Sequence, residues 1–124
     1  MNKTILKAIE RIRWNTEHHF LHIKNQHEIA PQIGVQFSMG YTDARFIQFF
    51  LEDQEDQTDL WDEFTKTFEE ISEYELAFIK GGLAGFNEQY GSDDQMKHYE
   101  ATQTAMLLIV DKVRFLALTY ENNV

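Results

Sequence analysis

Apolar residues recur at spacings of three and four over most of this chain, which is the pattern of amphipathic α-helices. The first stripe is formed by Ile5, Ile9, Ile12, Thr16, Phe20, Ile23 and His27. It predicts a helix from about Thr4 to Ala30 that ends at Pro31, because proline interrupts the hydrogen bonds of a helix interior. Trp14 and Leu21 lie seven residues apart on the opposite face. That face is either covered by a second element or forms an interface.

The stretch 31–41 contains no charged residue, and we expect it to form a buried loop. A short apolar helix is predicted over 44–52, with Thr42 or Asp43 as its N-cap. A third helix is predicted over 58–80, because apolar residues again recur at helical spacing and two glycines follow at 81–82. These glycines favour a helix C-terminus, and the residues after them read as a connection.

The last helix is predicted to begin at a capping box in which Ser92 caps the backbone and Gln95 reaches back. Apolar side chains such as Leu108, Phe115 and Leu118 occupy faces other than its main stripe, so we expect this helix at the centre of the domain. Three long helices with one or two short ones predict an all-α fold. The expected architecture is a compact helical bundle that forms one domain over residues 1–124.

Composition narrows the class of protein further. The chain has 124 residues, is 43% hydrophobic and contains no cysteine, which argues against disorder and excludes disulfides and cysteine-ligated zinc. The first residues do not resemble a secretory signal, and the longest apolar run, 105–110, is too short to span a bilayer. We therefore expect a cytoplasmic protein that does not bind membranes.

The net charge of −10 is concentrated in the middle of the chain. Residues 41–80 carry three basic and twelve acidic side chains, whereas residues 1–30 carry five basic and three acidic ones. Such a field repels nucleic-acid phosphates and attracts basic molecules. The charge predicts a basic protein partner and argues against direct binding of nucleic acid.

The strongest charge concentration is the run EDQEDQTDLWDE at 52–63, with seven carboxylates and no basic residue. It lacks the glycine of a calcium-binding EF-hand loop. An ordinary solvated face is the simpler alternative, with Lys66 sharing part of the charge. One lysine does not balance the excess, and Trp61 either packs in the core or anchors a partner. The predicted partner-binding residues are Glu52, Asp53, Glu55, Asp56, Asp59, Trp61, Asp62 and Glu63.

Two histidines at helical spacing are the candidate metal ligands of this sequence. His18 and His22 are four residues apart and, with His19, could hold a metal on one helical face. No HExxH or ExxH spacing accompanies them, so the favoured interpretation places His19 and His27 toward the core and leaves His18 and His22 solvated. We expect no metal and no other cofactor.

Glu75 interrupts an otherwise apolar stripe of the third predicted helix. A carboxyl group among phenylalanines is either an acid with a raised pKa or one partner of an ion pair, and the ion pair is the favoured interpretation. Its expected partner is one of three arginines, Arg13, Arg45 or Arg114. No serine, glycine-rich or histidine motif marks a reaction centre, so no catalytic residue is predicted.

These observations favour a non-enzymatic binding protein that neutralises a basic partner. An immunity protein or antitoxin that blocks a nuclease toxin is the most natural instance, since a nuclease must be positive where it holds phosphates. A nucleic-acid mimic that inhibits a defence system would obey the same physics. Two alternatives remain: a small metal- or ligand-binding bundle, with or without catalytic activity, and a homo-oligomer that associates through Trp14 and Leu21.

Overall fold

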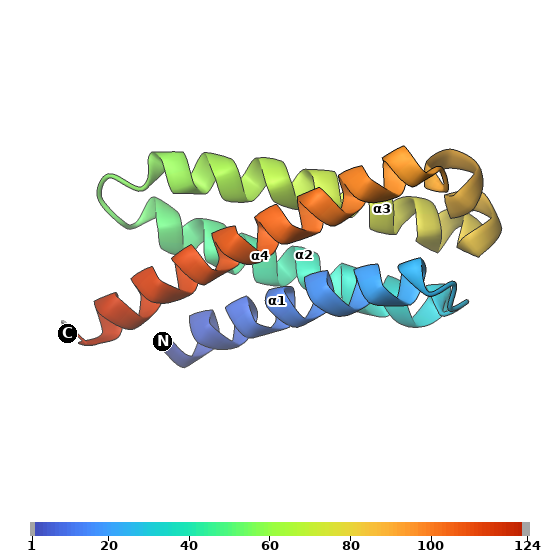
Figure 1. Ribbon diagram of the computed structural model, residues 1–124. Coiled ribbons are helices and arrows are strands. Elements are labelled where there is room, and N and C mark those ends of the chain that lie inside the picture. The colour runs from blue at the N-terminus through green and yellow to red at the C-terminus, as the bar shows by residue number, and fades with distance from the viewer. Residues whose placement is uncertain (1, 123–124) are drawn as a thin grey trace.

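The computed structural model describes residues 2–122, and this part of the chain contains four long α-helices and no strand (Figure 1). The helices are α1 (Asn2–Lys24), α2 (Ala30–Glu52), α3 (Thr58–Tyr90) and α4 (Asp93–Asn122). The all-α prediction is confirmed. The predicted helix lengths differ from those observed, because the expected loop and the expected short helix together form α2.

The helices form an antiparallel four-helix bundle. α1 and α3 each pack against both α2 and α4, so α2 and α4 occupy diagonal corners. The turn between α2 and α3 lies at the same end of the bundle as both chain termini (Figure 1). The connections from α1 to α2 and from α3 to α4 lie at the opposite end.

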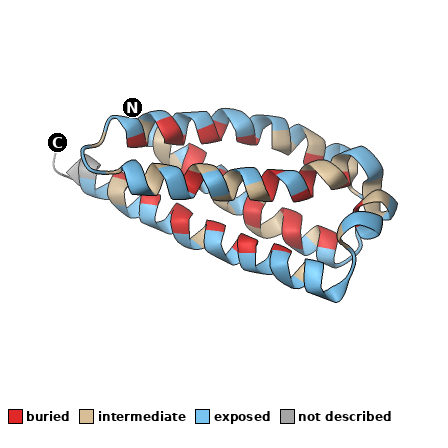
Figure 2. Ribbon diagram, turned by 90° about the horizontal axis from the view of Figure 1, so that it is seen from above, coloured by how far each residue is buried: buried red, intermediate tan, exposed pale blue. Residues whose placement is uncertain are grey.

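Each helix turns its buried residues toward the bundle axis and its exposed residues toward solvent (Figure 2). The stripe predicted for the first helix supplies α1 with four core residues, and the remaining helices contribute isoleucine, phenylalanine, valine and methionine. Residues with at most 3% exposure include Ile9, Ile12, Phe20, Ile23, Ile33, Ile47, Phe64, Ile71, Phe78, Met106, Val110 and Val113. Burial of this apolar surface is the main force that holds the helices together.

The boundary between the first two helices differs from the prediction. α1 ends at Lys24, and Pro31 is in the first turn of α2 instead of ending α1. Proline is tolerated there because the first N–H groups of a helix have no intrahelical acceptor. Residues 31–41 are therefore helical, and Val35 and Met39 are exposed rather than buried in a loop.

The first helical segment of α3 ends at the glycines 81–82, as predicted, and a second segment follows a kink at Gly82. Gly82 has φ of 64° and ψ of −162°, a backbone conformation that essentially only glycine adopts, and helical structure then resumes to Tyr90. The Leu83 N–H, freed by this break, donates to the carboxylate of Glu28 at 3.1 Å. The predicted connection is thus a final helical segment of α3.

The predicted Ser92 cap at the N-terminus of α4 is confirmed, because the Gln95 N–H donates to Ser92 Oγ at 3.2 Å. The predicted position of α4 at the centre of the domain is not. α4 is one corner of the bundle, and Leu108, Phe115 and Leu118 are exposed by 61%, 73% and 40%. The expectation of a central helix was wrong because those apolar side chains do not contribute to the core.

Candidate functional site

The seven carboxylates of residues 52–63 lie on the turn that joins α2 to α3 and on the helix ends that flank it, and we call this whole segment the acidic turn. α2 ends at Glu52, α3 begins at Thr58, and all seven carboxylate side chains are exposed. Asp56 has φ of 61°, a left-handed conformation in which Asp and Asn are enriched among residues other than glycine. The turn therefore brings together the carboxylates that the sequence analysis singled out, at one end of the bundle.

Helix electrostatics favour the acids on one side of this turn and oppose them on the other. Asp59 lies in the first turn of α3, where the positive end of the helix dipole stabilises a carboxylate. Glu52 and Asp53 lie at the C-terminus of α2, where the dipole is negative and no basic residue occupies the last turn. Each unfavourable placement costs about 0.3–1 kcal/mol.

Little basic charge approaches the acidic turn. Glu63 pairs with Lys112 of α4 at 3.6 Å, and both side chains are more than half exposed. Among the described residues, no other carboxylate of the turn has a cation within 4 Å. Six negative charges thus remain unpaired within a short segment, and their mutual repulsion lowers the stability of the domain.

Trp61 lies between the acidic turn and the core. Its side chain is partly buried, packs against the core cluster, and has a buried Nε1 without a hydrogen-bond acceptor in the described part of the chain. Another part of it lines an open hollow of about 350 Å³, together with Leu51, Gln54 and Asp62. Trp61 therefore has a packing role, and its accessible edge borders the carboxylates.

The histidines of α1 do not converge on one point. His18 donates from Nδ1 to the Trp14 carbonyl oxygen at 2.8 Å, and its ring stacks on the Trp14 indole. His22 instead meets His27 with 2.9 Å between their Nδ1 atoms. The described residues contain no cluster of three or more His, Asp or Glu side chains that could hold a metal. The expectation that His27 faces the core was wrong, because its side chain is exposed.

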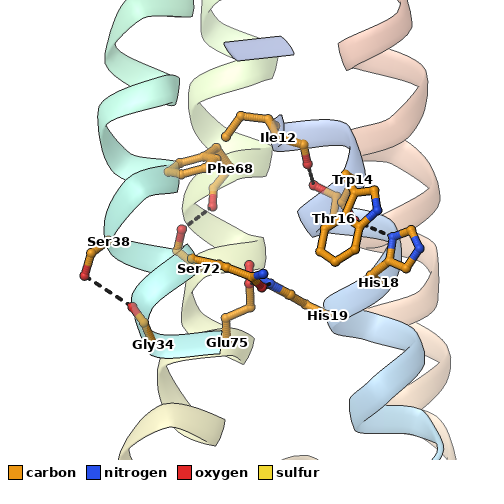
Figure 3. A network of polar contacts seen from close by, with 11 residues as sticks. Ile12, Trp14, Thr16, His18, His19, Gly34, Ser38, Phe68, Ser72 and Glu75 are labelled. Carbon is orange, nitrogen blue, oxygen red and sulfur yellow. Dashed lines mark hydrogen bonds and ion pairs between the residues drawn. The ribbon is translucent and has the colours of Figure 1, made fainter. Parts of the chain in front are cut away.

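A buried pair between His19 of α1 and Glu75 of α3 is the main polar feature of the core (Figure 3). His19 is 2% and Glu75 6% exposed. The His19 Nδ1–H donates to Glu75 Oε1, and Nε2–H donates to Gln36 Oε1 of α2 at 2.7 Å. Since both ring nitrogens face oxygen acceptors, the geometry fits an imidazolium.

Electrostatics support the charged form of this histidine. Burial by itself lowers the pKa of His19, but the hydrogen bond and negative charge of Glu75 and the hydrogen bond to Gln36 outweigh burial and raise it. Glu75 thus forms the ion pair that was expected, but with a partner that was not. Arg13 pairs with Glu17 and Asp111, and Arg45 bonds Gln48, so the expected arginine partner was wrong.

The cavity beside this pair is too small for a substrate. It measures about 20 Å³ and is lined by Thr16, His19, Gln36 and Glu75 together with apolar side chains. A space of this size holds about one water molecule. The buried pair consequently serves the core, and the acidic turn remains the candidate interaction site.

Trp14 and Leu21 lie on the face of α1 opposite its core stripe, where the sequence pattern placed them, and they are exposed by 47% and 42%. No helix in the described part of the chain is both long and apolar enough to cross a membrane.

No protein family matches this chain, and neither a curated protein nor a solved structure matches it. The assignment of a function therefore depends on the chemistry of the surface.

Proposed function

We propose that this protein is a non-enzymatic binding protein whose acidic turn neutralises a basic protein partner. An immunity protein or antitoxin is the most natural instance, with the acidic turn occupying the cationic substrate groove of a nuclease toxin. A nucleic-acid mimic directed against a defence system would use the same surface. The supporting observation is the set of seven exposed carboxylates in the acidic turn, of which one is ion-paired among the described residues.

The energetic cost of this turn also supports a role in binding. Solubility requires charge but does not require it to be concentrated against the negative end of a helix dipole, as it is at Glu52 and Asp53. A field of this kind accelerates the approach of a basic protein, with association rate constants that reach about 10⁸–10⁹ M⁻¹s⁻¹ and fall with salt. The exposed edge of Trp61 borders the carboxylates, where an aromatic side chain can contact a bound partner.

The partner can be captured from the native host at low salt and identified, and it should be basic. Association kinetics then test the site with a charge-reversed variant that carries Asp53→Lys, Glu55→Lys and Asp62→Lys. Asp56 is left unchanged because its positive φ suits aspartate. We expect the association rate constant to fall at least about tenfold and its salt dependence to weaken, with the dissociation rate less affected.

A matched control carries Glu69→Lys, Glu73→Lys and Glu88→Lys, which changes the net charge equally at exposed sites on α3 away from the turn. It should alter the association rate by about threefold or less, because charges beyond a Debye length of about 8 Å are screened at physiological salt. Equal rates for the two variants would refute a binding site at the acidic turn.

A further inference from the structure

The outward face of α2 is apolar over most of its length. Val35, Met39, Phe46 and Phe49 are exposed by 64%, 54%, 41% and 53%. Together with exposed Thr42 and Asp53, they follow alternating spacings of four and three residues, which places them in one line along the helix. We call the six residues Val35, Met39, Thr42, Phe46, Phe49 and Asp53 the α2 seam.

The bundle itself does not use this seam. The core contacts of α2 come from its other face, which includes buried Ile33, Ala44, Ile47 and Leu51. An alternation of three and four residues is the pattern by which one helix packs against another, and contiguous exposed apolar surface marks interaction sites. The α2 seam therefore has the form of a surface for one further helix.

A hollow between α1 and α2 lies beside the seam. It has a volume of about 250 Å³, and its lining includes Trp14 and the seam residue Met39. The bidentate ion pair of Arg11 with Asp43, at 2.7 and 2.9 Å, forms part of the same lining. This hollow is large enough to receive one long apolar side chain from a helix that lies on the seam.

Charge along α2 determines what kind of helix fits. Residues 30–42 have no charged side chain, and Arg45 lies over the Phe49 ring at 4.7 Å. The seam then ends at Asp53, within the acidic turn. A complementary helix is therefore apolar along one side and cationic at one end. A second copy of this chain has a net charge of −10 and offers the acidic turn no surplus of cations.

We propose that the α2 seam binds an amphipathic helix of the basic partner, with apolar side chains on the seam and Lys or Arg side chains against the acidic turn. This inference rests on the proposed function, and it specifies the element of the partner that α2 recognises. Binding by an amphipathic helix in a surface groove is a common mode of recognition.

Synthetic helical peptides of about 21 residues serve as probes, because they span about 31 Å and the seam spans about 27 Å. One peptide has leucine at the first and fourth positions of each heptad and lysines confined to its first heptad. A second has the lysines in its last heptad, which covers the opposite direction of binding. A third has the composition of the first in scrambled order, so that charge is kept and the apolar side is lost. The dissociation constant is measured by fluorescence anisotropy of labelled peptide.

The test variant carries Phe46→Ser and Phe49→Ser, and a second variant, Val35→Gln with Met39→Gln, removes the other end of the seam. Leu108→Ser with Phe115→Ser is the matched control, because it removes exposed apolar side chains from the diagonal corner. Circular dichroism verifies that each variant folds. We expect one ordered peptide to bind the intact protein at least about 30-fold more tightly than it binds either seam variant, with the control changing affinity by about threefold or less.

The possible failures are distinguishable. If the seam variants bind like the intact protein while the charge-reversed variant of the acidic turn binds weakly, the seam inference is overturned and the proposed function stands. If charge reversal has no effect, both are overturned. Failure of both ordered peptides to bind at about 100 μM, or binding of the scrambled peptide with equal affinity, overturns the inference. Light scattering provides a further test. If it shows that the intact protein is a dimer and that the Phe46→Ser, Phe49→Ser variant is a monomer, a second copy occupies the seam and the inference is overturned.

Discussion

Replacing Glu75 tests whether the buried pair is ionic. His19 and Glu75 are 2% and 6% exposed, so neither charge can be solvated when its partner is lost. Removing one member of such a pair costs about 3–5 kcal/mol, against a total stability of about 5–15 kcal/mol for an ordinary domain. Glu75→Leu should therefore lower the free energy of unfolding by about 3–5 kcal/mol. Glu75→Gln removes the charge but keeps the shape and a hydrogen-bonding group.

The pH dependence gives this prediction a definite sign. The pKa of His19 is raised in the folded state above its ordinary value of 6.5. The stabilisation it provides is then complete below pH 6.5 and is lost as the pH rises through the raised folded pKa, at up to about 1.4 kcal/mol per pH unit. In Glu75→Gln the opposing anion is gone, and burial lowers the pKa of His19. The stability difference between the two proteins should consequently be largest near pH 6 and shrink toward pH 9.

Urea titrations followed by far-UV circular dichroism at pH 6, 7, 8 and 9 measure these free energies. A double variant, His19→Leu with Glu75→Leu, should lose much less stability than the sum of the two single losses, since an apolar pair leaves no buried charge. A stability difference between the native protein and Glu75→Gln that does not change with pH would refute the ionic pair. Additive losses in the double variant would also contradict it.

Substitutions at three further positions test packing and backbone conformation by the same urea titration. Trp61→Phe removes a buried N–H that lacks an acceptor, so it should change the free energy of unfolding by less than about 1 kcal/mol, whereas Trp61→Ala should cost about 3–5 kcal/mol. Gly82→Ala should cost about 1–3 kcal/mol, because φ is 64° and a Cβ would lie 2.9 Å from Glu28 Oε1. Ser92→Ala should cost about 1 kcal/mol through loss of the α4 N-cap, with Ser92→Gly close to neutral as its control. A loss above about 2 kcal/mol for Trp61→Phe would contradict the argument from the unpaired N–H. No measurable loss for Gly82→Ala would contradict the argument from its backbone conformation, and no measurable loss for Ser92→Ala would contradict the N-cap.

Periodicity identified most of the core because burial of an apolar stripe does not depend on knowing the neighbouring helices. Ile9, Ile12, Phe20 and Ile23 are buried as their spacing predicted. Periodicity could not decide whether Pro31 ends one helix or begins the next, since proline is compatible with both positions. That ambiguity concealed the α2 seam, although the spacing of Val35, Met39, Phe46 and Phe49 was present in the sequence.

The partner of Glu75 could not be predicted for a different reason. His19 was expected to face the core, and Glu75 was expected to form an ion pair, and both expectations are confirmed. Their pairing depends on how α1 and α3 are aligned along the bundle axis. His19 and Glu75 are 56 residues apart in the sequence. Spacing within one helix contains no information on that register, so charge alone suggested an arginine.

α2 departs from the usual rules of helix stability at both of its ends. The other helices have favourable charge at one end, with His22 and Lys24 in the last turn of α1 and acids in the first turns of α3 and α4. α2 has no side-chain N-cap and no favourable charge at either end, and it has acids at its C-terminus. α4 also exposes apolar side chains, but it begins with an N-cap and two acidic residues. Departures from local rules are expected at functional sites, so those of α2 support the proposal that a partner binds along α2 and the acidic turn.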